Sequence, residues 1–458
     1  MAPPGGNETI AAIATPFGRG ALGVIRLSGS EAAVLAARLL RLPSKDSFEP
    51  RKSLLGRAYG ETEIDQVVAV FYPGPGSATG EDLVEITCHG STYILELLMQ
   101  NLLAFGARAA APGEFTQRAF LNGKMDLAQA EAVAALIGAR TEQAHRSALN
   151  QLEGECSRRV RAARQDIIEL LVRIEANLDH PEEDIPSLTQ AEACSALGRS
   201  SQSLARWLGS WDQGRIMREG ARVCIVGRPN AGKSSLLNAL LGFDRAIVCA
   251  SPGTTRDTVE EPARLGRLPS VLIDTAGLRE RCADEAEREG MSRTERALDG
   301  SDIALLVIDG SRPIEPADRA VHERVLAHAG RRPVISVLNK ADLACRVAPA
   351  NGDLRISARS GEGIDRLIEE ISRRLSPSGH CAEDETMAIS SLRHFECLRD
   401  AHAELVQAEE AVRLFPLQWE DKAASHLRRA SRCLGEIIGE GAPDEVLRTI
   451  FSRFCVGK

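Results

Sequence analysis

Residues 227–235 read Gly-Arg-Pro-Asn-Ala-Gly-Lys-Ser-Ser and follow the apolar run Val-Cys-Ile-Val at 223–226. The spacing G-x-x-x-x-G-K-S, between a strand candidate and a helix candidate, is that of a phosphate-binding loop. In such a loop, backbone N–H groups and the positive end of the following helix face a polyphosphate. We therefore predict a nucleotide site in which Lys233 contacts the outer phosphates and the Ser234 hydroxyl binds Mg²⁺.

Four more motifs follow the loop in the order that a GTP-binding domain requires. They are Thr254-Thr255-Arg256-Asp257, Asp274-Thr275-Ala276-Gly277, Asn339-Lys340-Ala341-Asp342 and Ser357-Ala358-Arg359. We expect a threonine of the first motif to complete the Mg²⁺ shell, Asp274 to hold the ion through water, and the Gly277 N–H to contact the γ-phosphate. The Asp342 carboxylate can accept two hydrogen bonds from guanine, whereas adenine presents no such donor pair. The last motif would support the base through its backbone, so the order of motifs predicts GTP binding.

These motifs do not identify all the groups that GTP hydrolysis requires. In Ras-like proteins a Gln after the D-x-x-G motif orients the attacking water, but here that position is Leu278. A leucine side chain forms no hydrogen bond, so either another group orients the water or hydrolysis is very slow. Asn230 carries an amide oxygen suited to a monovalent cation, and residues 244–253 could bring backbone carbonyls to the same place. For Asn230 the alternative is an ordinary loop-stabilising amide.

The composition is that of a globular chain with several domains. It has 458 residues, 43% hydrophobic and 26% charged, and this length predicts about two to four domains. The net charge of −8 neither indicates nor excludes a nucleic-acid partner. The 11 cysteines include no C-x-x-C pair, which favours reduced thiols. Because we find no signal-peptide pattern and no apolar run near the roughly 18 residues of a membrane span, we expect a cytoplasmic protein.

The first third of the chain changes from mixed to helical patterns. Residues 1–120 alternate strand candidates with helix candidates, which predicts an α+β domain. The strand candidates are 10–14, 22–27, 67–72 and 83–88, and the helix candidates are 31–40 and 93–105. Helical patterns then fill 125–177 and 189–211 and are separated by a proline-flanked acidic break at 180–186. One helical face is expected to carry Ile167, Leu171, Ile174 and Leu178.

The rest of the chain contains an inserted module. Residues 218–375 alternate strands and helices, which is typical of a parallel α/β sheet, and residues 385–453 are helical again. In this last segment one apolar face carries Leu398, Ala401, Leu405, Ala408 and Val412. Both flanking helical segments are amphipathic. We therefore predict that they pack together as one discontinuous domain.

Motifs outside the nucleotide site carry a resemblance to a known family. They are Glu8-Thr9-Ile10, Ala14-Thr15-Pro16, Gly18-Arg19-Gly20, Arg26-Leu27-Ser28-Gly29, Thr79-Gly80-Glu81-Asp82-Leu83-Val84-Glu85, His89-Gly90, Pro112-Gly113-Glu114-Phe115-Thr116, Arg118 to Leu127 and the C-x-G-K stretch 455–458. With the inserted module, they make the chain similar, almost end to end, to the tRNA-modification GTPase family MnmE (TrmE).

The resemblance implies a multidomain fold. An α+β N-terminal folate-binding and dimerisation domain would occupy 1–121, a discontinuous α-helical domain 122–217 and 377–458, and an inserted α/β P-loop (Ras-like) G domain 218–376. A tetrahydrofolate derivative, in the 5-formyl or methylene form, is the implied cofactor. The positions that match the family's folate contacts are Arg26, Glu85, Lys124 and Lys458. Surface ion pairs are the alternative for these residues. Ala78 stands where the family has an aromatic residue, so packing beside the folate site is expected to differ.

The resemblance also implies the catalytic and ion-binding residues. K⁺ would bind the Asn230 side chain, Thr254 and the carbonyls of Cys249 and Ser251, while Mg²⁺ would bind Ser234 and Thr255. The catalytic residue would be Glu287, with Glu285 as the alternative because residues 281–283 carry one extra position. Cys455 is a second catalytic candidate, and closing the folate site is its alternative role. The expected nucleotide contacts are Asn230, Ala231, Gly232, Lys233, Ser234, Ser235, Cys249, Ala250, Ser251, Pro252, Gly253, Thr254, Thr255, Asp274, Thr275, Ala276, Gly277, Asn339, Lys340, Asp342, Ser357, Ala358 and Arg359.

The resemblance further implies the partners and the reaction. The chain would form a homodimer and bind an FAD-dependent MnmG-type flavoprotein as a heterotetramer. Together they would install an aminomethyl or carboxymethylaminomethyl group at the 5-position of the wobble uridine of certain tRNAs. Two alternatives remain open from the sequence. One is an Era-like GTPase switch in ribosome assembly or regulation, and the other is a folate-binding scaffold with a vestigial G domain.

Overall fold

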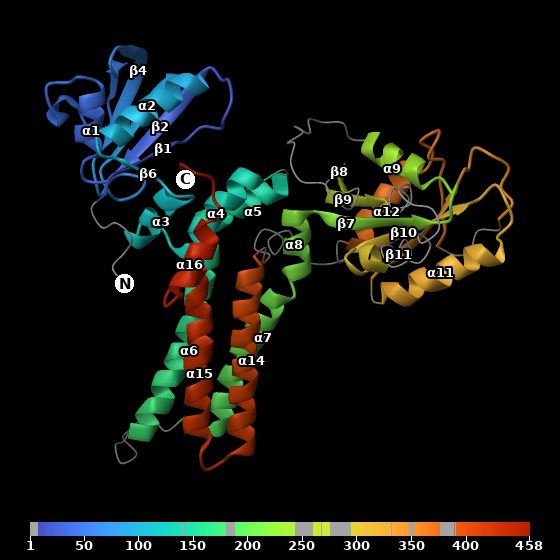
Figure 1. The fold of residues 1–458 in the computed structure, drawn as a ribbon. Helices are drawn as coiled ribbons and strands as arrows, with labels where there is room; N and C mark the ends of the chain where they lie inside the picture. The colour runs from blue at the N-terminus through green and yellow to red at the C-terminus, as the bar shows by residue number, and fades with distance from the viewer. Residues whose placement is uncertain are drawn as a thin grey trace, which may run out of the picture. The chain divides into compact units, whose positions relative to one another are not determined.

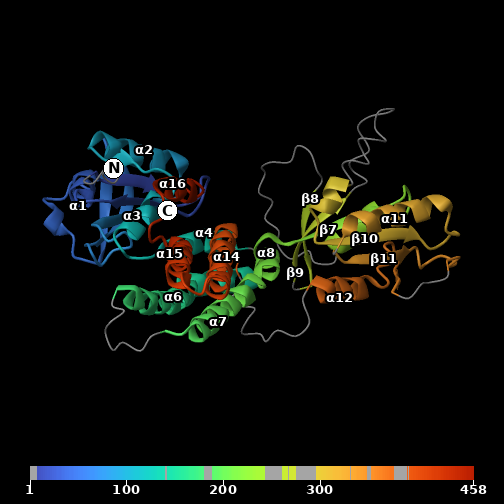
Figure 2. The same ribbon diagram turned by 90° about the horizontal axis from the view of Figure 1, so that it is seen from below.

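The structure is a computed structural model (Figures 1 and 2) that describes residues 8–139, 142–179, 188–242, 260–266, 268–274, 295–330, 332–347, 352–375, 389 and 391–458. The chain divides into two compact units. Unit 1 contains residues 1–138, 148–201 and 400–458, and unit 2 contains residues 139–147 and 202–399. No helix in the described ranges is both long and apolar enough to cross a bilayer.

Unit 1 begins with a six-stranded sheet in the order β3-β4-β5-β2-β1-β6. The strands are β1 (Ile10–Ile13), β2 (Leu22–Ser28), β3 (Ser53–Tyr59), β4 (Glu63–Tyr72), β5 (Leu83–His89) and β6 (Arg108–Ala109). Neighbouring strands are antiparallel except β1 and β6. Helices α1 (Ala32–Leu39) and α2 (Thr92–Ala104) pack on one face, where Ile25, Leu27 and Leu98 are fully buried. The expected α+β architecture is therefore confirmed.

The sequence patterns missed the strands at both edges of this sheet. Neither β3 nor the two-residue β6 was predicted, and β4 begins before the expected residue 67. The cause lies in the pattern of β3, where Leu55 is 66% exposed and Gly56 carries no side chain. An edge strand with few buried positions lacks the alternation that identifies a strand.

The remainder of unit 1 is helical. The helices that belong to it wholly or in part are α3 (Glu114–Leu121), α4 (Leu127–Gly138), α5 (Glu142–Leu152), α6 (Glu155–Asp179), α7 (Gln190–Leu208), α14 (Leu392–Leu414), α15 (Trp419–Ile438) and α16 (Asp444–Phe451). α15 lies along α6 (Figure 1), although the two helices are far apart in sequence. The Arg164 side chain of α6 donates to Ser431 Oγ at 3.1 Å, and Arg428 of α15 pairs with Glu175 at 2.6 Å. The predicted pairing of the two helical segments is confirmed.

Among the predicted apolar-face positions whose burial the structure describes, a set that leaves out Leu178, all but one are buried. All five positions expected on the face of α14 are buried, as are Ile167 and Ile174 of α6. Leu170 of α6 is buried at 5% exposure, whereas the predicted Leu171 is only partly buried. Adjacent helical positions are separated by about 100° around the axis, so a wide apolar stripe can include either one.

Unit 2 contains a second six-stranded sheet, in the order β12-β11-β10-β7-β9-β8. The strands are β7 (Ala221–Gly227), β8 (Glu260–Leu265), β9 (Leu268–Asp274), β10 (Ile303–Asp309), β11 (Val334–Asn339) and β12 (Leu354–Arg355). The helices are α8 (Trp211–Glu219), α9 (Lys233–Gly242), α11 (Pro316–Ala329) and α12 (Ile364–Leu375). All pairs are parallel except β8 and β9. The α/β module is confirmed, with an antiparallel edge strand that the sequence analysis did not predict.

The helix expected over 189–211 is two helices. α7 ends at Leu208 and α8 begins at Trp211. Between them the Ser210 hydroxyl donates to the Trp207 carbonyl at 2.7 Å, which competes with continuing the helix. In unit 2, the Trp211 ring stacks on Phe395 of α14 with centroids 4.7 Å apart.

Shortening a buried side chain of α15 should destabilise the helical part of unit 1. Leu434 is fully buried in α15, so Leu434→Ala should lower the free energy of unfolding by about 2–5 kcal/mol. Denaturant titration followed by tryptophan fluorescence measures this change. Leu417→Ala is the matched control, because Leu417 is 97% exposed and its loss should change stability by less than about 0.5 kcal/mol. Equal effects of the two changes would contradict the packing described.

Candidate functional site

The phosphate-binding loop lies between β7 and α9, at the carboxyl edge of the parallel strands. Asn230 and Gly232 both have positive φ, +64° and +94°. Lys233 is 7% exposed, and its ammonium donates to the Arg228 carbonyl at 2.9 Å. The Ser234 hydroxyl donates to Asp274 Oδ2 at 3.2 Å. The structure thus brings together Ser234 of α9 and Asp274 of β9, two of the three residues predicted to hold Mg²⁺, and their hard oxygen atoms fit that ion.

Asn339 joins the phosphate loop to the loop expected to hold the base. Its amide nitrogen donates to the Ala231 carbonyl at 3.0 Å, and its amide oxygen accepts from the Ala358 N–H at 3.0 Å. Asn339 is only 3% exposed. A Cβ on Gly232 would lie 2.1 Å from the Asn339 amide nitrogen, so glycine is required at this close approach.

The predicted base-recognition residues lie together beyond β11. The Ser357 hydroxyl donates to Asp342 Oδ1 at 2.7 Å, and Asp342 is exposed. This hydrogen bond lowers the pKa of the Asp342 carboxyl, which stays ionised and able to accept hydrogen bonds. Lys340, at φ +68°, donates to Asp309 Oδ2 at 2.6 Å.

Two contacts at this edge were not predicted. Burial acts to raise the pKa of Asp309, but hydrogen bonds from Lys340 and Ser311 outweigh it, so that pKa is lowered. Arg228, in the phosphate loop, donates to Glu315 at 2.6 Å and Asp318 at 3.2 Å. Glu315 and Asp318 form the capping box of α11. The position of Asp309 at the carboxyl end of an apolar strand was the signal that could have identified it.

Part of the predicted site lies outside the described residues. This part comprises Cys249, Ala250, Ser251, Pro252, Gly253, Thr254, Thr255, Thr275, Ala276, Gly277, Glu285 and Glu287. The residues predicted to bind K⁺, other than Asn230, are among them, as are both candidates for the catalytic glutamate.

Of the four residues proposed for folate, unit 1 brings Arg26 and Glu85 into direct contact and holds the Lys458 backbone against that of Phe115. Arg26 and Glu85 face each other across β2 and β5, with their side chains 2.5 Å apart. The Phe115 ring centroid is 5.8 Å from Arg26 Cζ. The backbone N–H of Phe115 donates to the Lys458 carbonyl at 3.2 Å. Lys124 instead donates its ammonium to the Pro75 carbonyl at 3.0 Å. The aromatic partner of Arg26 was not predicted, although Phe115 lies in a quoted motif.

The cysteines of the described residues differ in their surroundings. Burial raises the pKa of Cys88 to about 11 and that of Cys224 to about 12, so both thiols are protonated at neutral pH. Cys455 is exposed, and its carbonyl accepts from the Gly113 N–H at 3.4 Å. The chain end is therefore held beside α3 through backbone contacts, while the Cys455 side chain faces solvent.

These features define a P-loop protein of the GTP-binding class. At one edge of its sheet lie a buried lysine, a hydrogen-bonded serine–aspartate pair, and a base loop that the Asn339 side chain joins to the phosphate loop. The family described as "GTP-binding protein TrmE N-terminus" matches residues 9–124, and "MnmE helical domain" matches residues 127–455.

Full-length relatives agree with these matches. The tRNA modification GTPase MnmE of Aquifex aeolicus is 41% identical over 99% of this chain and 100% of its own. Those of Laribacter hongkongensis and Chloroflexus aurantiacus are 44% and 45% identical, over 98% and 99% of this chain and 99% and 100% of theirs. The chain belongs to the MnmE family of tRNA modification GTPases.

Removing the hydroxyl beside Asp342 should shift the pH dependence of nucleotide binding. A lowered carboxyl pKa keeps the accepting form present until the pH falls through that low value. In Ser357→Ala the carboxyl pKa rises, so GDP affinity should begin to fall at a higher pH during acidification. Titrations of fluorescent GDP between about pH 7 and pH 4, spanning the ordinary aspartate range, measure the shift.

Ser360→Ala is the matched control, because only the Ser360 backbone N–H contacts the Ser357 hydroxyl. Its binding profile should follow that of the unchanged chain. Superimposable profiles for Ser357→Ala and the unchanged chain would show that this hydrogen bond does not control Asp342.

Proposed function

We propose that this chain is a cytoplasmic, K⁺-activated GTPase that acts on tRNA with an FAD-dependent MnmG-type partner. Together they would add an aminomethyl or carboxymethylaminomethyl group at the 5-position of the wobble uridine of certain tRNAs, using a one-carbon unit from a tetrahydrofolate. The observation that carries the proposal is the end-to-end match, at 41–45% identity, to relatives named tRNA modification GTPase MnmE. The joined phosphate and base loops support GTP as the nucleotide.

The described nucleotide residues support particular roles. Lys233 would exchange the Arg228 carbonyl for phosphate oxygens, and Asp342 would accept from the guanine ring. Ser234 and Thr255 would bind Mg²⁺, and Asp274 would hold the ion through water. When bound, Mg²⁺ neutralises charge on the phosphates. Asn230 is exposed and has a left-handed backbone, so its amide oxygen is available to a K⁺ ion. Glu287, with Glu285 as the alternative, would orient the attacking water that Leu278 cannot orient.

The paired charges in unit 1 support the folate part of the proposal. The Glu85 carboxylate can accept from the N–H groups of a pterin edge. The cationic side chains of Arg26, Lys124 and Lys458 can pair with the carboxylates of the folate glutamate tail. Phe115 offers an aromatic face on the same side of the sheet as Arg26.

The proposal distributes these tasks over domains. Residues 1–121 would bind folate and dimerise, 122–217 with 377–458 would form the helical domain, and 218–376 would form the G domain. The family matches at 9–124 and 127–455 support the first of these divisions. Two G domains would face each other in the homodimer, and GTP hydrolysis would open and close them to rearrange the heterotetramer with the flavoprotein.

GTP turnover should depend on K⁺ and on Glu287. We expect turnover in KCl to exceed that in NaCl by at least about tenfold, because a cation beside the phosphates offsets developing charge. Glu287→Ala should lower kcat by a factor of about 10² or more, the usual contribution of a group that assists proton transfer or orients water. Phosphate release under steady state measures both.

Glu285→Ala is the matched control and should retain turnover. If Glu285→Ala is the inactive variant, the alternative assignment is correct. Equal turnover in KCl and NaCl would contradict K⁺ activation.

Loss of the gene should remove the wobble modification. Nucleoside mass spectrometry of tRNA from a deletion strain should lack the 5-substituted wobble uridines, and the wild-type chain should restore them. Leu417→Ala should also restore them because its side chain is exposed, whereas Glu287→Ala should not. Normal modification in the deletion strain would instead favour an Era-like regulatory role.

A further inference from the structure

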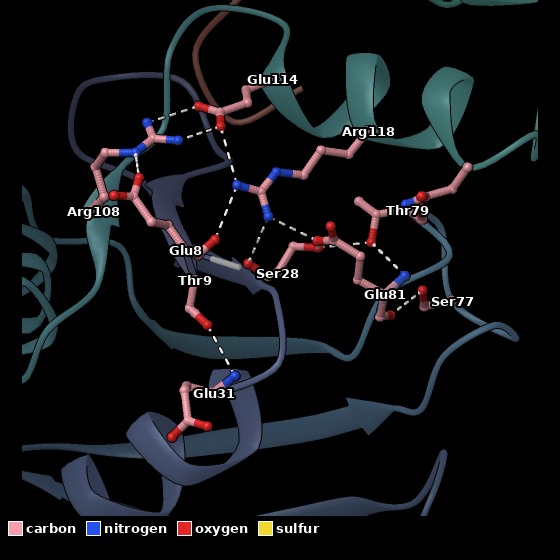
Figure 3. Close-up of polar contacts among 11 residues, drawn as sticks. Glu8, Thr9, Ser28, Glu31, Ser77, Thr79, Glu81, Arg108, Glu114 and Arg118 are labelled. Carbon is pink, nitrogen blue, oxygen red and sulfur yellow. Dashed lines mark hydrogen bonds and ion pairs between the residues drawn. The ribbon is translucent and has the colours of Figure 1, made fainter. Parts of the chain in front are cut away.

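Unit 1 contains a network of charged groups that is centred on two buried side chains (Figure 3). Its centre is the α3 residue Arg118, which is 8% exposed, and Glu114, one helical turn earlier, is 7% exposed. Burial of a charge is unfavourable unless that charge is paired and hydrogen-bonded. The network therefore needs its full set of partners.

Arg118 contacts four separate segments of the chain. Its guanidinium donates to Glu81 Oε2 at 2.9 Å and to Glu114 Oε1 at 3.2 Å. It also donates to the backbone carbonyls of Glu8, at 3.0 Å, and Ser28, at 3.5 Å. One side chain thus joins the segment before β1, the end of β2, the loop before β5 and the first turns of α3 (Figure 3).

Neighbouring side chains hold the two carboxylates in place. Glu81 Oε2 also accepts from the Ser28 hydroxyl at 2.8 Å, and that hydroxyl is 2.7 Å from Thr79 Oγ1. Glu114 Oε2 accepts from Arg108 at 3.0 Å and from the Ala111 N–H at 2.8 Å. Both acidic partners of Arg118 therefore have fixed positions, and a shift of the guanidinium would be transmitted to each.

The same segments carry the candidate folate residues. Ser28 lies two residues after Arg26 on β2, so both side chains are on the same face of the sheet. The loop with Glu81 leads into β5, where Glu85 pairs with Arg26. Glu114 precedes Phe115, whose ring contacts Arg26 and whose N–H binds the Lys458 carbonyl.

We propose that Arg118 is a positioning residue for the folate site, which sets the placement of the Arg26–Glu85 pair against Phe115. This inference rests on the proposed function, since it assumes that Arg26 contacts a reduced folate. Lysine cannot replace Arg118 in this role. A single ammonium on a flexible stem does not reproduce the planar group that reaches both carboxylates and both carbonyls.

The test is a double-mutant cycle in the full chain. The affinity for 5-formyltetrahydrofolate is measured by calorimetry for the unchanged chain, Arg118→Lys, Arg26→Ala and the double variant. We expect Arg118→Lys and Arg26→Ala each to weaken binding at least tenfold. The double variant should bind no more weakly than Arg26→Ala, because residues that act through one contact give non-additive effects.

Two controls accompany the cycle. Arg161→Lys changes an arginine of unit 1 that pairs with Asp126 on a half-exposed surface, and it should leave folate affinity unchanged. GDP affinity reports on unit 2 and should be the same for every variant. If Arg118→Lys does not fold, Glu81→Gln removes the charge of its partner with little change of shape and enters the same cycle.

Each outcome decides the inference. Binding of Arg118→Lys within twofold of the unchanged chain would overturn it. Fully additive losses for Arg118→Lys and Arg26→Ala would also overturn it, because they indicate a packing role independent of Arg26. If the unchanged chain does not bind 5-formyltetrahydrofolate, the folate assignment itself fails and the inference fails with it.

Discussion

The pairing of α6 with α15 is the contact on which the arrangement of the chain depends. Arg164 reaches both Ser431 and Glu440, which are 267 and 276 residues away in sequence. Neither amphipathic segment buries its apolar face without the other. Closing so long a loop has an entropic cost, but that cost grows only slowly with length. A complete α/β module can therefore occupy the intervening sequence while the helical domain remains one folded body.

The described part of the candidate nucleotide site could be located from the sequence because each motif is local in sequence. Each motif follows a strand, and parallel strands bring their carboxyl ends to one edge. The motifs and this rule together predicted Ser234 near Asp274 and a base loop with Asp342. What the motifs could not supply was the double contact of the Asn339 side chain, which depends on the distance between two loops.

The candidate folate residues were predicted singly and not as an arrangement. That Arg26 faces Glu85 follows from the register of β2 with β5, and sequence patterns do not determine register between strands so far apart. Glu81, Glu114 and Arg118 stood in quoted motifs, yet no role followed from them. Their partners come from four segments that only the folded chain brings together. The strand β3 was missed for a different reason. It lies at the edge of the sheet, where few of its side chains are buried, so its sequence shows no clear alternation of apolar and polar residues.

The stacking of Trp211 on Phe395 also bears on how such a chain could arise. These rings lie near the two ends of the longer segment of unit 2, residues 202–399, and their centroids are 4.7 Å apart. A module whose two ends meet can be inserted into a host, or removed from it, with only a short join to repair the path. Recombination could thus exchange the nucleotide-binding module as a cassette. The helical host would keep its own core, and selection could act on the two parts at different rates.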